Sequence, residues 1–475
     1  MSARSRTIWT FIITSAALFI AQLDTLVVTT ALPAIRQNLH ASLSSLEWTV
    51  NAYTLTFAVL LMTGATLGER FGRRRMLVIG LAVFTLGSAA AALAPTATAL
   101  IVARAIQGAG AAIITPLTLT LLSAAVPVQK RGMALGIWGG VAGLAIATGP
   151  VVGGAVVQGW SWQTIFWLNV PLGLALIPIA WFKLPESRGL TTRLDLPGVA
   201  LASAGLFGIV LGLIRGNELG WTSTFVVTSI AAGAALVAAF VAWELRATEP
   251  MLPMRLFRSR GFSFTNLASA LMFFGMFGSI FLLAQFLQTV QHYSPLQAGL
   301  RTLPWTAMPM IVAPIAGILA DRIGGRPVVL TGLALQTLGL AWLAHICTST
   351  VSYGALVPAF VLNGIGMAMF MAPVATLVLG FVRRDEEGIA SGAANALREL
   401  GGVFGVAVLA SVFASHGSYL SPAAFAEGMR AAIAVGAVAV AVATVALVGV
   451  PRRRSLTVEL HAETATAGEL AAAAA

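Results

Sequence analysis

Long apolar stretches separated by short polar segments dominate the 475-residue chain. A helix needs about 20 mostly apolar residues to cross the hydrocarbon core of a bilayer. The fourteen stretches that meet or approach this length lie at 8–34, 47–68, 76–94, 98–122, 134–158, 164–184, 196–214, 222–244, 262–287, 300–320, 327–347, 354–382, 389–414 and 429–450. The pattern predicts an all-α polytopic membrane protein with 14 transmembrane helices.

The composition excludes a soluble or disordered protein. Hydrophobic residues make up 58% of the chain, charged residues only 9%, and the mean hydropathy is +0.90, whereas soluble domains carry about 25% charged residues. The longest gap between stretches, 245–261, is too short for a soluble domain. The first stretch is too long for a cleaved signal sequence and contains Asp24. Any function must therefore come from the helical bundle.

The reactive side chains indicate neither a metal site nor an enzyme. Cys347 is the only cysteine, which excludes a disulfide within the chain. The histidines have no metal-ligand spacing, and an intramembrane enzyme would need His, Asp or Cys residues clustered within the spans. The five histidines are His40, His292, His345, His416 and His461. We therefore expect no metal, no cofactor and no catalytic residues.

The basic residues predict the orientation of the chain. The net charge is +11, and 22 of the 28 Lys and Arg residues fall in the N-terminus and in every second loop. Because cytoplasmic loops carry the excess of basic residues, both termini are expected in the cytoplasm, and the charge does not indicate nucleic-acid binding. The Arg-rich composition and the absence of an Asn-X-Ser/Thr acceptor favour a bacterial cytoplasmic membrane.

Two parts of the chain resemble each other at a nearly constant offset. Three landmarks recur 252 to 256 residues apart, namely Glu69 and Asp321, Gly108 and Gly364, and Gly132 and Gly388. The repeat predicts two parallel six-helix halves with two inserted helices between them, an architecture typical of transporters. The expected domains are 1–190, the inserted pair 191–248, 249–452, and a disordered cytoplasmic tail 453–475.

Motifs in order along nearly the whole chain resemble those of the major facilitator superfamily, in particular its fourteen-helix drug:proton antiporters. The motifs are LDTLVVTTALP (23–33), WTVNAYTL (48–55), LGERFGRRR (67–75), RAIQGAG (104–110), GIWGGVAGLAIATGPVVGG (136–154), NVPLG (169–173), GILADRIGGR (317–326) and ANALRELGGVFG (394–405). The sequence departs from the family pattern at Thr29 for Asn, Ala65 for Gly, Glu69 for Asp and Glu399 for Gln.

The resemblance implies a major facilitator fold and proton-coupled efflux of lipophilic, cationic or zwitterionic compounds by alternating access. The partners implied are a small-molecule substrate, protons and the lipid bilayer. The energy source is the proton gradient, and the protein functions as a monomer. A dedicated exporter of one endogenous metabolite or self-made antibiotic is the alternative, because the sequence does not identify the substrate.

Asp24 is the first candidate for proton coupling. A carboxylate within hydrocarbon costs several kcal/mol, so it requires a cavity or a partner. At a rise of 1.5 Å per residue, Asp24 lies about 24 Å from the cytoplasmic edge and Arg104 about 9 Å from the external edge, which places both at similar depth. We expect Asp24 to carry the proton and Arg104 to adjust its proton affinity or relay the proton. A permanent structural ion pair is the alternative.

Arg398 and Glu399 are a second candidate pair for proton coupling. They lie near mid-bilayer, about 14 Å from the start of their span at residue 389. Neighbouring residues point about 100° apart on a helix and satisfy each other poorly. Glu399 is therefore a candidate second titratable group, and a structural salt bridge is the other interpretation.

Three further sets of residues complete the candidate sites. The loop motifs predict a cytoplasmic latch, or alternatively an ordinary basic loop, at Glu69, Arg70, Gly72 and Arg73 and again at Asp321, Arg322, Gly324 and Arg326. The Gly/Pro-rich fifth span predicts a close-packed, bendable helix, with an antiport role implied by the resemblance, at Gly149, Pro150, Gly153 and Gly154. The candidates for lining a substrate cavity are Gln107, Trp48, Tyr53 and Asn363.

Overall fold

The computed structural model describes residues 3–127, 131–189, 194–383 and 386–450, so the expected tail at 453–475 lies outside the described residues. Within these ranges the regular structure is helical, and fourteen helical segments are long and apolar enough to cross a membrane, which confirms the predicted number. The helices are α1 (Ala3–Asn38), α2 (Leu43–Phe71), α3 (Arg73–Ala92), α4 (Ala97–Ala125), α5 (Arg131–Gly159), α6 (Thr164–Trp167), α7 (Asn169–Lys183), α8 (Leu196–Leu219), α9 (Thr224–Glu244), η2 (Met254–Arg258), α10 (Arg260–Thr289), α11 (Pro295–Thr306), α12 (Met308–Ile323), α13 (Gly325–Ile346), α14 (Tyr353–Leu379), α15 (Glu387–His416) and α16 (Pro422–Val448).

Two of the spans are interrupted. The sixth is divided into α6 and α7 around Leu168, and the tenth into α11 and α12 around Ala307. Pro309 follows the second interruption directly, and a proline lacks the N–H that would continue the helical hydrogen bonds. The tenth span can therefore change direction while still crossing the bilayer.

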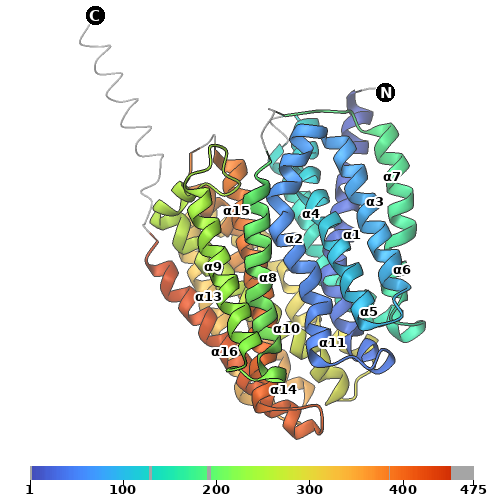
Figure 1. Ribbon diagram of the computed structural model, residues 1–475, viewed down its shortest axis with the longest axis vertical. Helices are drawn as coiled ribbons and strands as arrows, with labels where there is room; N and C mark the ends of the chain where they lie inside the picture. The colour runs from blue at the N-terminus through green and yellow to red at the C-terminus, as the bar shows by residue number, and fades with distance from the viewer. Residues whose placement is uncertain (1–2, 128–130, 190–193, 384–385, 451–475) are drawn as a thin grey trace, which may run out of the picture.

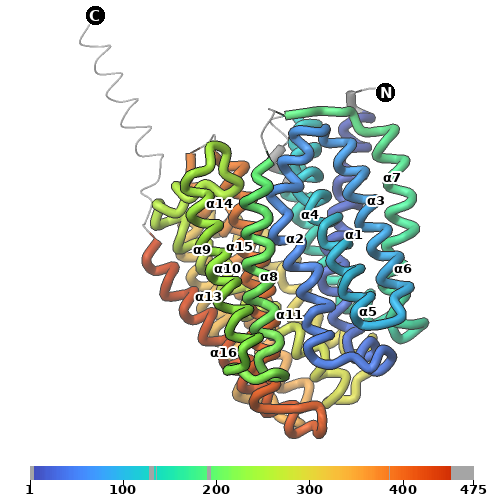
Figure 2. The backbone as a smooth tube through the Cα atoms, in the orientation of Figure 1, coloured from blue at the N-terminus to red at the C-terminus, as the bar shows by residue number. Residues whose placement is uncertain are grey.

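The helices form one bundle with the first and last six spans side by side (Figure 1). The tube in Figure 2 shows α8 running beside the seam between them, and α8 packs against both α2 and α15. Trp48 of α2 contacts Phe207 with a ring-centroid distance of 5.3 Å. On the other side of the seam, Asn217 donates to the Ser411 carbonyl at 2.6 Å. The inserted pair therefore touches both halves of the bundle through α8.

The two halves meet closely at one end of the bundle, here called the closed end. A Cβ atom on Gly154 of α5 or on Gly299 of α11 would collide with the backbone of the opposite helix. Gln288 donates to the Thr30 carbonyl at 2.9 Å, and the Arg36 guanidinium lies 3.5 Å from the Tyr419 ring centroid. Each contact joins the first six spans to the last six.

Toward the other end, here called the basic end because it bears Arg73, Arg246 and Arg326, the face of α5 that packs at the closed end has no neighbour. Gly154 faces α11 at the closed end, and four further glycines continue that face of α5 toward the basic end. A Cβ atom would meet nothing within 4 Å at Gly136, Gly139, Gly140 or Gly143. The same helix face is thus packed at one end and open at the other.

Candidate functional site

Five buried polar side chains from four helices meet within the first half. We call Asp24 of α1, Ser88 of α3, Arg104 and Gln107 of α4, and Asn169 of α7 the polar cluster. Each is at most 2% exposed. Small residues allow this close approach, because a Cβ atom on Gly87 would collide with the Gln107 backbone. The cluster therefore lies in a dry, close-packed site.

The Asp24 carboxylate is surrounded by hydrogen-bond donors. Arg104 forms a buried ion pair with Oδ2. Oδ1 accepts from Gln107 Nε2 at 2.8 Å and from Asn169 Nδ2 at 2.9 Å. A charge-assisted hydrogen bond stabilises an ionised acceptor more than a neutral one. Both oxygens of the Asp24 carboxylate therefore have hydrogen-bond donors.

Arg104 has additional partners that fix its guanidinium group. Its Nη1 also donates to Gln107 Oε1 at 2.8 Å, and its Nε donates to the Thr49 carbonyl at 3.1 Å. The guanidinium lies 4.3 Å from the Tyr53 ring centroid, within the range of a cation–π contact. Tyr53 is in turn held by its hydroxyl, which donates to the Ala21 carbonyl at 2.9 Å.

Ser88 connects the amide side chains behind Asp24. Its hydroxyl accepts from Gln107 at 3.2 Å and from Asn169 at 3.1 Å, and it donates to the Phe166 carbonyl at 2.9 Å. No sequence pattern points to Ser88, and Asn169 is part of the NVPLG motif. A buried amide at the start of a membrane span was the signal that would have identified Asn169.

Asp24 and Arg104 depend on each other for charge compensation. Loss of the negative charge on Asp24 would leave the buried Arg104 without a counter-ion. An unpaired buried charge is far more costly than a paired one. Such a loss would therefore favour movement of Arg104 or of the helices that hold it.

Arg398 and Glu399 form a looser pair in the second half. Arg398 Nη2 lies 3.5 Å from Glu399 Oε1, and the Arg398 guanidinium is 4.8 Å from the Phe273 ring centroid. The Glu399 residue is 7% exposed, whereas 26% of the Arg398 side chain is accessible. The poor geometry agrees with the expectation for adjacent helical residues and leaves Glu399 less firmly bound than Asp24.

The loop between α2 and α3 contains the ion pair expected of a latch. Glu69 accepts two hydrogen bonds from Arg73, at 2.9 and 2.8 Å. Gly72 has φ 108°, a conformation that favours glycine. The segment before α8 closes onto this loop, because Gly189 N donates to the Glu69 carbonyl at 3.2 Å. The carboxylate of Glu186 accepts from the backbone N–H of Arg74 at 3.1 Å.

The corresponding loop of the second half repeats the turn but not the ion pair. Gly324 has φ 90°, as the repeat predicts. Arg326 instead donates to the Val448 carbonyl at the end of α16, at 2.6 Å. Asp321 forms no ion pair with another described residue. The ion pair is not repeated because Gly325 stands at the position equivalent to Arg73. Arg326, like its equivalent Arg74, donates to a carbonyl at the end of the last helix of its half.

The Gly/Pro-rich part of α5 packs against two neighbouring helices. Gly149 and Gly153 face α1, where Gly149 approaches Leu26 and Gly153 approaches Thr30. Gly154 faces α11, and the Pro150 carbonyl lies against Gly299 of α11. The expected close packing between the halves is therefore present at the closed end.

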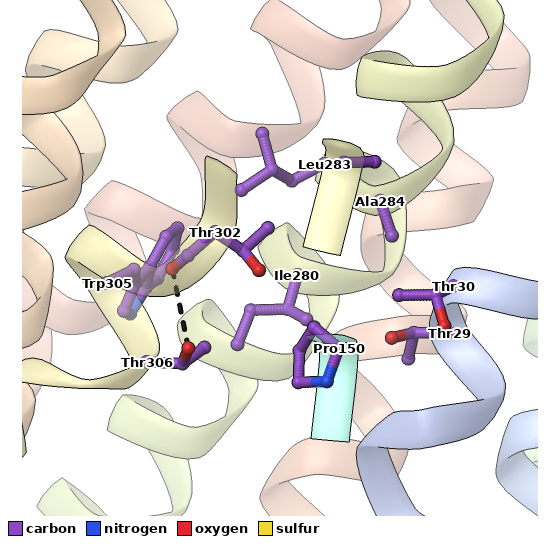
Figure 3. Close-up of a pocket in the computed structure, with 10 residues that line it drawn as sticks. Thr29, Thr30, Pro150, Ile280, Leu283, Ala284, Thr302, Trp305 and Thr306 are labelled. Atoms are coloured by element: carbon purple, nitrogen blue, oxygen red, sulfur yellow. Dashed lines mark hydrogen bonds between the residues drawn. The ribbon is translucent and has the colours of Figure 1, made fainter. Parts of the chain in front are cut away.

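A small pocket lies between the halves near these contacts (Figure 3). Side chains of α1, α5, α10 and α11 line it, including Thr29, Pro150, Ile280 and Thr306. The four residues proposed for a substrate cavity lie elsewhere. Those residues are Tyr53 and Gln107 beside Arg104, Asn363 against Gly339 of α13, and Trp48 against α8. Their place in a substrate cavity stays a prediction, because this small pocket does not test it.

The sequence matches the profile of the Major Facilitator Superfamily over residues 14–195 and 265–470. It is 37% identical to the multidrug resistance protein Stp of Mycobacterium tuberculosis, in an alignment that covers 86% of this chain and 76% of Stp. It is 34% identical to the tetracenomycin C resistance and export protein of Streptomyces glaucescens, with 88% and 78% covered. The cephamycin export protein CmcT of Amycolatopsis lactamdurans is 37% identical, with 93% and 92% covered.

Solved structures show the same fold. The xylose transporter XylE from E. coli, in a partially occluded inward-open conformation, aligns with a TM-score of 0.60 and 16% identity, covering 91% of this chain and 97% of XylE. The nucleoside transporter NupG aligns with a TM-score of 0.64 and 14% identity, with 94% and 100% covered.

Proposed function

The chain belongs to the major facilitator superfamily and is a multi-pass membrane transporter, and we propose that it exports lipophilic, cationic or zwitterionic small molecules in exchange for protons. The observation that carries the proposal is the buried Asp24 carboxylate, paired with Arg104 inside a membrane-spanning bundle. An intramembrane acid that can exchange a proton is costly to keep unless it has a function. Relatives named for resistance and export support the direction of transport.

The basic end of the bundle is proposed to face the cytoplasm of a bacterial cell, with both termini on that side. The described conformation is then open to the cytoplasm and closed to the outside. Alternating access requires the contacts of α5 with α11 to separate while the basic end closes. In this proposal the Glu69–Arg73 loop is the cytoplasmic latch, and the thin α5 is the helix that moves between the halves.

Asp24 couples the two movements in this proposal. A proton that reaches Asp24 from the outside weakens its ion pair with Arg104 and favours return to the inward-open state. Release of that proton to the cytoplasm restores the ion pair that the structure describes. Glu399 is proposed as a second titratable group, for a substrate cation or a second proton, with Arg398 as its partner. The transporter is proposed to work as a monomer driven by the proton gradient.

The test uses proteoliposomes with an imposed proton gradient and a pH-sensitive dye. Lipophilic cations, biocides and antibiotics are added one at a time to the parent protein and to Asp24→Asn. The parent should move protons when a substrate is added, and Asp24→Asn should not. Glu218→Gln is the matched control, because Glu218 is an exposed acid paired with Arg215. Full substrate-driven proton movement by Asp24→Asn would refute the assigned role of Asp24.

A dedicated exporter of one compound is the second candidate function. It is favoured by relatives whose names each give a single antibiotic, tetracenomycin C and cephamycin. A response to one chemical class within the panel, with silence toward the rest, would support this candidate. A response to several unrelated classes would support multidrug efflux.

A further inference from the structure

Glu47 of α2 is a buried acid that the polar cluster does not include. It is 3% exposed, and its Oε2 atom has no hydrogen-bond partner. Among the described residues, no arginine, lysine or histidine forms an ion pair with it. One helical turn further along α2, Asn51 is fully buried and both of its amide atoms are also unpaired.

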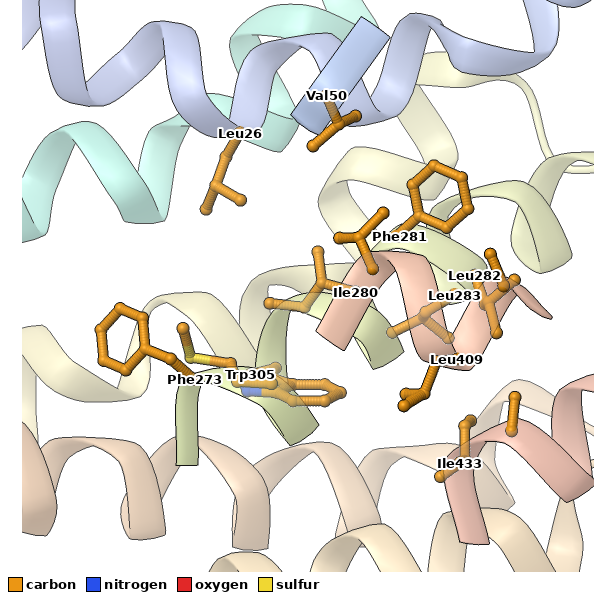
Figure 4. Close-up of a cluster of buried hydrophobic side chains, with 14 of the residues drawn as sticks. Leu26, Val50, Phe273, Ile280, Phe281, Leu282, Leu283, Trp305, Leu409 and Ile433 are labelled. Carbon is orange, nitrogen blue, oxygen red and sulfur yellow. The ribbon is translucent and has the colours of Figure 1, made fainter. Parts of the chain in front are cut away.

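Glu47 lies at the closed end, on a part of α2 that joins the two halves. Its neighbours Leu46 and Val50 belong to the hydrophobic core shared with α10, and Figure 4 shows Val50 and Leu26 facing Ile280 and Phe281. Further along α2, Leu55 packs in a cluster with residues of α15. Any movement that opens the closed end must therefore change the surroundings of Glu47.

The charged groups around Glu47 do not compensate an ionised carboxylate. Glu218 of α8 adds a second negative charge nearby. Burial raises the pKa of Tyr419, in the loop before α16. The positive charge of Arg36 lowers this pKa and a negative charge on Glu47 raises it, so both side chains act on this tyrosine. Other charged groups on the packed elements already have partners, namely Arg215 with Glu218, Asp24 with Arg104, and Arg398 with Glu399. Arg6, Glu69, Arg70 and Glu387 lie toward the basic end of these helices. The histidines His40 and His416 lie near helix ends.

Asp24 and Glu47 differ in the hydrogen-bond donors that surround their carboxyl groups. Asp24 accepts hydrogen bonds from a guanidinium and two amides, which compensate a negative charge. Glu47 has a buried oxygen with no donor, and a buried ion without a partner is strongly destabilised. Such a group binds a proton instead. The closed end is therefore stable only when Glu47 is protonated.

We propose that Glu47 is a second protonation site, which controls opening of the closed end. Glu47 takes up a proton from the solution on that side before closure and returns the proton to the same side when the end opens and the carboxyl group is hydrated. No proton crosses the membrane in this step. Acid on that side thus favours the state open at the basic end. The inference rests on the alternating access of the proposed function but not on its substrate.

The experiment measures how accessible the closed end is in purified full-length protein in lipid nanodiscs. Cys347 is replaced by Ala, and a reporter cysteine is introduced as Thr30→Cys, at a buried position that lines the pocket in Figure 3. A polar maleimide labels the protein at several pH values. A second protein with Leu420→Cys, at a position that is 94% exposed, corrects for the effect of pH on the thiol itself.

With Glu47 present, the corrected labelling rate should rise by roughly tenfold between about pH 6 and about pH 8, because one linked proton changes an equilibrium by up to tenfold per pH unit. Glu47→Gln is always neutral, so its labelling should stay low and independent of pH. Glu47→Asp retains an acid and should retain the response, as should the control Glu427→Gln, which removes an exposed acid from α16. Elution as a single monodisperse peak on size exclusion verifies that each variant is folded.

A pH response that persists in Glu47→Gln would overturn the proposal and assign the response to another group, such as a histidine. Labelling of Glu47→Gln that exceeds the parent at high pH would also overturn it, because the neutral side chain would then open the end rather than close it. Neither measurement needs a substrate or a gradient. Failure of drug-driven proton exchange would therefore refute the proposed function without affecting this test.

Discussion

The first six and last six spans share their helix packing but not their chemistry. Glycines at equivalent positions approach the same neighbours in both halves. A Cβ atom on Gly108 would collide with the Tyr53 carbonyl, and one on Gly364 with the Trp305 carbonyl. Two more contacts of the first half recur in the second. Gly80 approaches Gly110 as Gly332 approaches Gly366, and Gly87 approaches Gln107 as Gly339 approaches Asn363. The packing of α3 on α4 is therefore repeated in α13 on α14.

The side chains placed on this common packing differ between the halves. Arg104 lies 4.3 Å from the Tyr53 ring centroid, whereas the equivalent Phe360 has its ring 6.1 Å from that of Trp305. Gly149 contacts Leu23 in the first half, and the equivalent Gly405 contacts Phe274 in the second. Leu23 and Phe274 are therefore equivalent, and the residue after each gives the next pair, Asp24 and Gly275. Gly275 and Phe360 thus stand where the first half has Asp24 and Arg104, and neither carries a charge. The fold does not require the ion pair, which is why we assign the pair to function.

The largest effect should come from breaking the pair on one side only. Arg104→Leu leaves Asp24 buried without a counter-ion, and the free energy of unfolding should fall by about 3 to 5 kcal/mol. The double variant Asp24→Leu with Arg104→Leu should recover most of this loss, because it gives the first half the apolar character of the second. Denaturant titration in mixed micelles measures both values.

The same two proteins separate structure from transport. The double variant should be folded but inactive in the proteoliposome assay, because it has no acid at this position. A double variant as unstable as Arg104→Leu would show that the ion pair is structural and that the comparison between the halves is misleading. Phe360→Leu, which changes the equivalent apolar position, serves as the matched control and should cost less than about 1.5 kcal/mol.

The sequence predicted the repeated framework because glycines and hydrophobic stretches recur at fixed offsets. It also placed Asp24 and Arg104 at similar depth, since helical rise converts residue number to depth. It did not identify Asn169 and Ser88 as partners of Asp24. Depth follows from counting along one helix, but a contact depends on how several helices are rotated and tilted.

Glu47 illustrates the same limit. It lies next to Trp48, where the WTVNAYTL motif begins, and near the end of a span, so an acid there is easily taken as part of an exposed loop. The packing of α4, α8 and α15 against α2 buries that region. The second loop of the repeat lacks the ion pair for a different reason, because Gly325 stands where the first half has Arg73.

A smaller effect should test the shared packing itself. Gly108→Ala and Gly364→Ala each place a methyl group against a backbone carbonyl, and overpacking of this kind costs about 1 to 3 kcal/mol. The two losses in the free energy of unfolding should be similar. Gly136→Ala is the control, because a Cβ atom there meets nothing within 4 Å, and it should have no effect or be slightly stabilising. Losses that differ strongly between the halves would argue against a common framework.

The smallest effect should come from Tyr53→Phe, which keeps the ring beneath Arg104 and removes only the hydrogen bond to the Ala21 carbonyl. One such bond contributes about 1 kcal/mol to the free energy of unfolding. The hydroxyl does not take part in the cation–π contact, so the losses in Tyr53→Phe and Arg104→Leu should add to within about 0.5 kcal/mol in the double variant. Trp305 is the equivalent residue, and its Nε1 has no hydrogen-bond partner. The hydrogen bond from Tyr53 to the first helix of its half is therefore not repeated in the second half. A strong coupling between the two substitutions would mean that the hydroxyl helps to position Arg104, and the aromatic ring would then belong to the polar cluster rather than to the packing that both halves share.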